Sequence, residues 1–167
     1  MGEKTEKNLG KAFAAESKAS LRNAAFALKA EKEEYTNAAR LFKAVADSES
    51  VHANRFLLLM RGKIGTTEEN LKTAFENEIR ATASEYPQLI LDAEEENANN
   101  AVMKAFTQTR DVEERHAMLY KSMINDMLEG RETDYYVCQI CGYIAKNEIP
   151  ENCPVCGAVS SRFKSIS

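Results

Sequence analysis

Both histidines of the chain lie three residues after a glutamate. Residues at this spacing project side by side from one face of a helix. A carboxylate and an imidazole are costly to bury unless something pairs with them, and a metal ion would do so. Oxygen and imidazole donors without a thiolate favour iron or manganese over a structural zinc. The two motifs are Glu49-Ser50-Val51-His52 and Glu113-Glu114-Arg115-His116.

Each motif lies at the centre of an apolar stripe with helical spacing, running from Ala38 to Leu59 and from Val102 to Met127. Two further helical segments place a lone glutamate on a similar stripe, Glu16 in one and Glu78 in the other. One Glu from each of two helices, with Glu-x-x-His from each of the other two, is the ligand set of di-iron or di-manganese carboxylate bundles. The pattern therefore predicts a four-helix bundle around two metal ions.

The helices that must position these ligands are predicted over residues 5–30, 35–61, 67–95 and 98–129. Gly62 and Gly65 favour the end of the second helix. Thr66 and the acidic residues after it read as the N-terminal cap of the third. Pro87 removes a backbone donor and is expected to kink or loosen the third helix just before it.

The four cysteines form two Cys-x-x-Cys pairs near the end of the chain, and a glycine follows each pair. Paired spacing of this kind in an intracellular protein indicates a metal site rather than disulfides. Four thiolates suit tetrahedral iron or zinc, and the spacing alone does not choose between them. The predicted ligands of this four-cysteine site are Cys138, Cys141, Cys153 and Cys156.

Charge and hydropathy exclude some classes of function. The formal net charge is −4 at pH 7, without a basic stripe, so nucleic acid is a poor candidate partner. No apolar run approaches the length of a membrane span. The first residues are charged and lack an apolar segment, so we expect no secretory signal and a cytoplasmic protein.

The bundle motifs and the cysteine-rich tail together resemble the rubrerythrin family over essentially the whole chain. The pieces Cys138-Gln139-Ile140-Cys141-Gly142-Tyr143 and Cys153-Pro154-Val155-Cys156-Gly157 are similar to rubredoxin. The resemblance implies a mainly α fold. Residues 1–134 would form a ferritin-like four-helix bundle, with a linker from about 130, and residues 135–167 a small rubredoxin-like domain with short strands.

The same resemblance implies a non-haem di-iron peroxidase that reduces hydrogen peroxide to water in defence against oxidative stress. Electrons would pass through one iron in the four-cysteine site, supplied by a rubredoxin or an NAD(P)H-dependent reductase. The family also implies a head-to-tail homodimer, in which one subunit's tail approaches the other subunit's di-iron site. Glu16 and Glu78 would be terminal ligands, Glu49 and Glu113 would bridge, and His52 and His116 would each bind one iron.

The chain departs from the family pattern at two positions. Ala81 stands where the family has a second Glu on the third helix, and Asn23 stands where it usually has a Tyr. Tyr86 is retained, and Glu85 is a candidate for a supporting or proton-relay role, with an ordinary structural role equally open. We expect His52 to bind its iron in both redox states, because Ala81 cannot act as a ligand; water filling the gap in the oxidised state is the alternative.

Two other functions would use similar ligands. Iron storage, as in ferritins, needs no electron relay, and the tail would hinder closure of a cage. An oxygen-activating di-iron oxidase would need an apolar channel for an organic substrate, which a sequence does not reveal. Consumption of peroxide with a reduced donor, compared with oxygen consumption and iron loading, separates the three.

Overall fold

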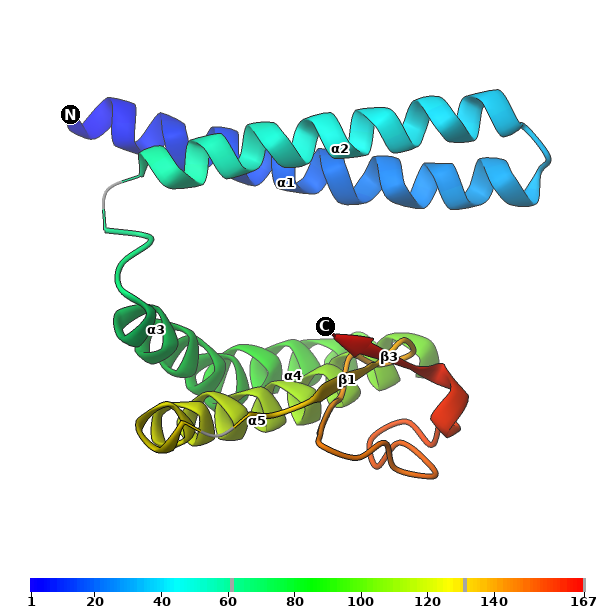
Figure 1. The fold of residues 1–167 in the computed structure, drawn as a ribbon. Helices are drawn as coiled ribbons and strands as arrows, with labels where there is room; N and C mark the ends of the chain where they lie inside the picture. Colours follow the sequence, from blue (N-terminus) through cyan, green and yellow to red (C-terminus); the bar gives the residue numbers. More distant parts are fainter. Residues whose placement is uncertain (61, 131, 167) are drawn as a thin grey trace. The chain divides into compact units, whose positions relative to one another are not determined.

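The computed structural model describes residues 1–60, 62–130 and 132–166. The chain divides into two compact units, Met1–Gly65 and Thr66–Ser167 (Figure 1). The first unit is a pair of helices, and the second combines further helices with a small sheet. Among the described residues, no helix is both long and apolar enough to cross a membrane.

The first unit is an antiparallel hairpin of α1 (Glu3–Lys32) and α2 (Thr36–Leu59). Small side chains allow the two helices to approach closely, and Ser20 Oγ donates a hydrogen bond across the pair to the Ala46 carbonyl at 2.9 Å. Both predicted helices are confirmed, although residue 61, the expected end of the second, lies outside the described residues. The buried contacts come from Ala27, Ala30, Ala39, Ala46 and Ala53.

The second unit begins with α3 (Thr67–Arg80), which continues through the π-helical segment η1 (Ala81–Glu85) into α4 (Tyr86–Glu95). The Thr66 side chain accepts a hydrogen bond from the Glu69 N–H, and the Glu69 carboxylate accepts one from the Thr66 N–H. This capping box confirms the predicted start of the helix. The π-helical turn lies directly before Pro87, which confirms that the helix is loosened there.

The last long helix, α5 (Asn100–Glu129), packs along α3 and α4. The Asn99 side chain caps its start by accepting from the N–H groups of Ala101 and Val102. Gly130 ends it with φ of +63°, in the left-handed region that favours glycine. The predicted helix over 98–129 is therefore confirmed to within two residues at its start.

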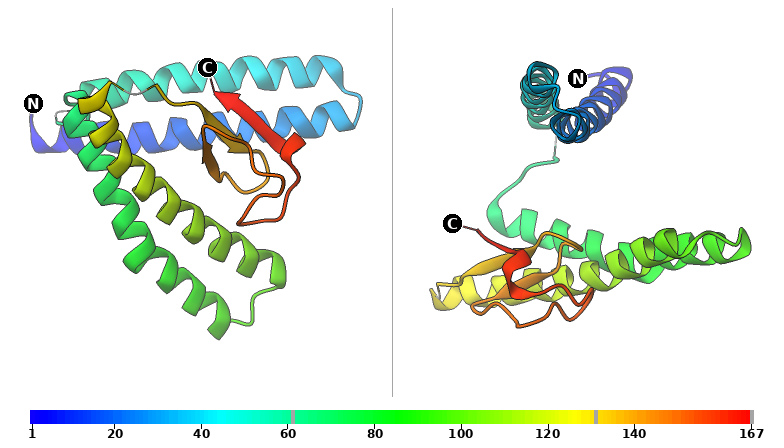
Figure 2. Two further views of the ribbon diagram at one scale, coloured as in Figure 1. Left: turned by 60° about the horizontal axis from the view of Figure 1, so that its bottom comes forward. Right: turned by 90° about the vertical axis from the view of Figure 1, so that its right-hand side faces the viewer.

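The tail forms a three-stranded antiparallel sheet with the order β2-β1-β3. Its strands are β1 (Tyr135–Cys138), β2 (Ile144–Lys146) and β3 (Phe163–Ile166), and the short 3-10 helix η2 (Ser160–Arg162) precedes β3. The sheet lies beside α5 (Figure 2). The predicted class, mainly α with a small rubredoxin-like domain, is confirmed. The predicted domain boundary at residue 134 stays a prediction.

Candidate metal centres

The four cysteines of the tail converge on one point. Their Sγ atoms all lie within 4.8 Å of one another, with 3.7 Å between Cys138 and Cys156 and 3.6 Å between Cys141 and Cys153. Metal–sulfur bonds of about 2.3 Å in a tetrahedron place neighbouring sulfurs about 3.8 Å apart. The observed spacing therefore fits one tetrahedral metal ion, as the two Cys-x-x-Cys pairs predicted.

Backbone N–H groups turn toward these sulfurs because each knuckle bends through a left-handed glycine, Gly142 with φ of +85° and Gly157 with φ of +75°. Burial opposes ionisation of Cys138, but hydrogen bonds from the Cys141 and Ile140 N–H groups lower the pKa of its thiol below the ordinary value. Burial raises the pKa of Cys141. A cation would complete this set, because it stabilises the thiolates that burial disfavours.

The hairpin holds a cluster of two carboxylates and one imidazole. His52 Nδ1 lies 3.0 Å from Glu49 Oε2 and 4.0 Å from Glu16 Oε2. A hydrogen bond between Glu16 and Glu49 is the main cause of the raised pKa of Glu16, with burial second, and the same bond lowers the pKa of Glu49. The two carboxylates therefore lie close enough to interact directly.

The second unit repeats this geometry. His116 Nδ1 lies 2.8 Å from Glu113 Oε2 and 3.9 Å from Glu78 Oε1. Burial and then the charge of Glu113 raise the pKa of Glu78. Donor atoms about 3 to 4 Å apart are the distances that ligands of one metal ion adopt when each bond is about 2.0–2.2 Å. The structure thus brings the six predicted ligands together as two sets of three, one in each unit.

Two tyrosines lie near the second cluster. Burial raises the pKa of Tyr86, and the charge of Glu113 adds to this, while a hydrogen bond with Thr109 acts in the opposite direction. Burial and then the charges of Glu78 and Glu113 raise the pKa of Tyr120. The sequence interpretation singled out Tyr86 but overlooked Tyr120, although its position four residues after His116 on the same helical stripe was a usable signal.

Glu85 and Ala81, the other two positions noted on the third predicted helix, supply no ligand to the cluster. Glu85 is exposed and pairs with Arg80 at 2.8 Å, so the structure does not bring it into the cluster. Ala81 is buried at the first residue of η1, one turn after Glu78. Its methyl group offers no ligand atom there.

The tail packs against α5 of the same chain. Arg115 Nε donates to the Ile144 carbonyl at 3.2 Å, and its guanidinium lies 5.7 Å from the centre of the Tyr143 ring. Lys146 Nζ pairs with the buried Asp126 at 2.5 Å and donates to Ser122 at 2.9 Å. The chain therefore doubles back along α5, and the cysteine knuckle at Gly142 approaches Val112.

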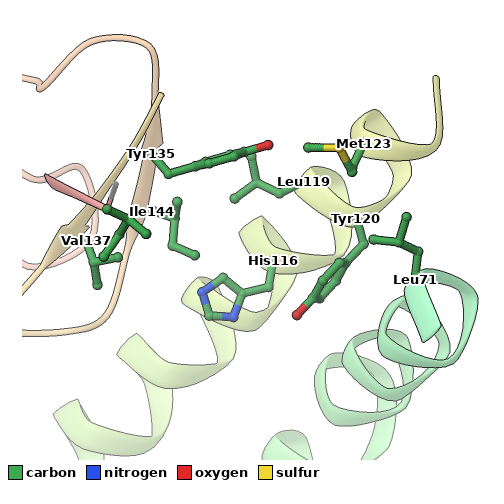
Figure 3. Close-up of a pocket in the computed structure, with 9 residues that line it drawn as sticks. Leu71, His116, Leu119, Tyr120, Met123, Tyr135, Val137 and Ile144 are labelled. Atoms are coloured by element: carbon green, nitrogen blue, oxygen red, sulfur yellow. The ribbon is translucent and has the colours of Figure 1, made fainter. Parts of the chain in front are cut away.

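A pocket of about 370 Å³ separates the tail sheet from α3 and α5. Figure 3 shows His116 between Ile144 of the sheet and Tyr120 of α5. The buried Nε2 of His116 has no hydrogen-bond partner among the described residues. The lining is otherwise mostly apolar and consists of Leu71, Leu119, Tyr120, Met123, Tyr135, Val137, Ile144 and Ile166.

These centres define a class of protein: helices with paired carboxylate–imidazole metal ligands, followed by a rubredoxin-like domain with four cysteine ligands. The family model "Rubrerythrin" matches residues 7–124, and the model "Rubrerythrin, rubredoxin-like domain" matches residues 136–164. The chain belongs to the rubrerythrin family. It carries the family's di-iron carboxylate–histidine ligands together with a rubredoxin-like four-cysteine site.

Named relatives agree along nearly the whole chain. A rubrerythrin of Porphyromonas gingivalis is 33% identical, over 99% of this chain and 91% of its own length. A nigerythrin of Nitratidesulfovibrio vulgaris is 33% identical, over 91% of this chain and 81% of its own length. A solved structure of nigerythrin in a mixed-valence state matches with a TM-score of 0.57 and 32% identity, covering 99% of this chain and 88% of that chain.

Proposed function

We propose that this protein reduces hydrogen peroxide to water, with electrons relayed through the four-cysteine centre. The observation that carries the proposal is the presence, in one chain, of both three-ligand clusters and a four-cysteine site whose domain packs on the helix that carries His116. Storage needs no such relay. The reaction consumes one peroxide, two electrons and two protons and releases two water molecules.

When bound, the two non-haem irons supply the two electrons for cleavage of the O–O bond. The chain's own residues hold and shield the site. Glu16, Glu49 and His52 would hold one side, and Glu78, Glu113 and His116 the other. Tyr86 and Tyr120 keep their phenol protons at neutral pH, because the ordinary pKa of tyrosine is about 10 and burial with the nearby carboxylates raises it further. Their O–H groups are therefore able to donate hydrogen bonds to oxygen at the site.

The packing of the tail supports electron delivery from the four-cysteine site to the cluster on α3 and α5 of the same chain. Sequence reasoning expected delivery from the tail of a second subunit, since the linker leaves α5 far from Glu113. The contacts of Arg115 and Lys146 with α5 offer a second route, within one chain. The proposed assembly is a head-to-tail homodimer, and the proposed donor is a rubredoxin or an NAD(P)H-dependent reductase.

Stopped-flow oxidation of the fully reduced, iron-loaded protein tests the proposal. Oxidised iron bound by four cysteines absorbs visible light through charge transfer from sulfur, so its colour reports the relay. Each fully reduced chain holds three electrons and one peroxide accepts two, so we expect a small excess of peroxide to restore the colour quickly, with no such response in a His116→Ala variant. Glu76→Gln, at an exposed position of α3, is the matched control.

Three results would contradict the proposal. The first is a tail that holds only zinc after expression with ample iron. The second is a response to oxygen but none to peroxide, which would indicate an oxidase. The third is uptake of iron far beyond the ions that the bundle and tail sites hold, which would indicate storage.

A further inference from the structure

Only part of the four-cysteine site is accessible at the surface. Cys138 and Cys153 are 1% and 3% exposed, whereas Cys141 and Cys156 are half-buried. Electrons pass between proteins efficiently only over short distances. A carrier that delivers electrons to this site must therefore approach Cys141 or Cys156.

An open cavity of about 410 Å³ lies beside one of these two sulfurs. We call it the cysteine notch. Lys104, Gln108 and Thr109 of α5 line one side of it, and Ile140 and Cys141 of the tail line the other. All of these residues belong to the second compact unit. The notch therefore leads from the protein surface to a ligand of the four-cysteine site.

Two cations flank the cysteine notch. Lys104 lies in its wall, and Arg162 lies beside it, because the Arg162 carbonyl accepts a hydrogen bond at 2.8 Å from Gln139, the residue before Ile140. Both cationic side chains are exposed, and neither makes an ion pair among the described residues. Positive charge thus lies next to the accessible sulfur, although the chain as a whole has a formal net charge of −4.

The centre of this surface is apolar. Ile140 lies in the knuckle between Cys138 and Cys141, and it is 53% exposed. Val159 is 54% exposed, and its carbonyl accepts a hydrogen bond from the Arg162 N–H at 2.9 Å. Protein interfaces commonly combine an apolar centre with a polar rim. Apolar side chains beside two unpaired cations fit a partner whose own apolar patch is bordered by carboxylates.

We propose that the cysteine notch is the docking surface for the electron donor, and that this donor is an acidic protein that carries one electron at a time. The inference rests on the proposed function, because it names the partner of the same electron relay. The carrier loses one electron and the metal held by the four cysteines gains it, while no bond forms or breaks. Electron-transfer encounters typically bury less than about 1,200 Å², so a surface of this size is sufficient.

Binding to a redox-inactive form of the protein tests docking apart from activity. With zinc in the four-cysteine site no electron can move, so titration with an oxidised rubredoxin of net negative charge measures affinity alone. We expect Lys104→Glu and Arg162→Glu each to weaken this affinity about tenfold at about 0.01 M salt. The difference should largely disappear at about 1 M salt, where charges are screened beyond about 3 Å.

Lys121→Glu is the matched control. Lys121 is also an exposed lysine of α5, and the substitution changes the net charge by the same amount. It lies about 26 Å further along the helix axis than Lys104. We expect its affinity for the carrier to stay close to that of the wild type. Equal weakening by Lys104→Glu and Lys121→Glu would show that net charge alone attracts the carrier, and would overturn the proposed surface.

The apolar centre is tested separately. Ile140→Ser should weaken binding at both salt concentrations, because salt does not screen the burial of an apolar side chain. The visible spectrum of the iron-loaded variant checks that the four-cysteine site is intact, and Ile140→Ala takes its place if iron is lost. An affinity equal to that of the wild type would contradict a docking surface centred on Ile140.

Two further measurements keep this inference apart from the proposed function. Oxidation of the pre-reduced wild-type protein by peroxide needs no donor, so its failure refutes peroxide reduction and leaves the affinity measurements valid. Reduction of the oxidised protein by the reduced carrier should be about tenfold slower in Lys104→Glu than in Lys121→Glu at about 0.01 M salt. Equal rates in these two variants, or no binding of the acidic carrier to the wild type, refute the docking surface alone.

Discussion

The two three-ligand clusters have nearly the same geometry in different surroundings. The shortest histidine–carboxylate distance is 3.0 Å in the hairpin and 2.8 Å in the second unit. The His52 side chain, however, is 46% exposed, and that of His116 only 22%. Helical spacing alone therefore reproduces the ligand geometry, whereas the surrounding dielectric depends on what packs beside each helix.

The causes of the pKa shifts follow the same division. Glu16 in the hairpin has a raised pKa chiefly because of its hydrogen bond with Glu49, while Glu78 has a raised pKa chiefly because it is buried. Within its own unit the second cluster has Tyr86, Tyr120 and the tail close to it. We therefore expect the second cluster to control reactivity and the hairpin cluster to complete the metal coordination.

Removal of one imidazole is expected to have the largest effect. His116→Ala deletes a neutral nitrogen ligand, and loss of even an outer hydrogen-bond partner of a metal ligand weakens binding about 10–100-fold. We expect more than about 100-fold weaker binding at one metal position and a matching loss of peroxide turnover. Metal analysis after dialysis, compared with His52→Ala, measures both clusters. Retention of two bundle metals and full activity would show that the carboxylates are not arranged as proposed.

Weakening the contact between the tail and α5 tests whether the tail gives the second cluster its reactivity. Lys146→Met removes the hydrogen bonds that Lys146 Nζ donates to Asp126 and to Ser122 between the tail and α5, and a hydrogen bond to a charged group contributes about 1.5–3 kcal/mol. We expect that loss in chemical denaturation, with slower oxidation of the tail iron by peroxide and unchanged bundle metal. Lys29→Met, which breaks an exposed pair with Glu33, is the control and should cost less than about 1 kcal/mol.

The pH dependence of the metal-free protein provides a smaller test. The folded-state pKa of Glu78 lies above the ordinary 4.5, so the folded state binds more protons than the unfolded state. The contribution of Glu78 to stability is therefore full below pH 4.5 and is lost as the pH rises through the raised value. We expect Glu78→Gln to flatten this decline and to abolish metal binding, while Glu76→Gln leaves both unchanged. An identical pH profile for wild type and Glu78→Gln would contradict the assignment.

Ala81→Glu is expected to cause the smallest change, a movement of one metal ion. The new carboxylate would lie one turn after Glu78 and offer an extra ligand. In the wild type we expect His52 to bind its iron in both redox states, whereas the variant should move that iron between ligands on reduction. Crystal structures of both proteins, oxidised and chemically reduced, measure this. A wild-type iron that changes ligands by itself would refute the fixed site.

Local sequence patterns were enough to predict the helices and the types of ligand. Helical periodicity placed Glu49 beside His52 and Glu113 beside His116, since side chains three residues apart share a helical face whatever packs against it. The two Cys-x-x-Cys pairs likewise predicted the four-cysteine site, because each knuckle is a local turn through one glycine. Capping signals, such as Thr66 with Glu69, located the helix ends.

The surroundings of those ligands became visible only in the folded chain. The packing of the tail on α5 through Arg115 and Lys146 depends on contacts between residues 20 to 29 positions apart, which no local pattern encodes. The π-helical turn at Ala81 and the burial of Tyr120 near Glu78 also follow from packing. Periodicity predicted a face for each ligand, but long-range packing set its exposure, its pKa and its neighbours.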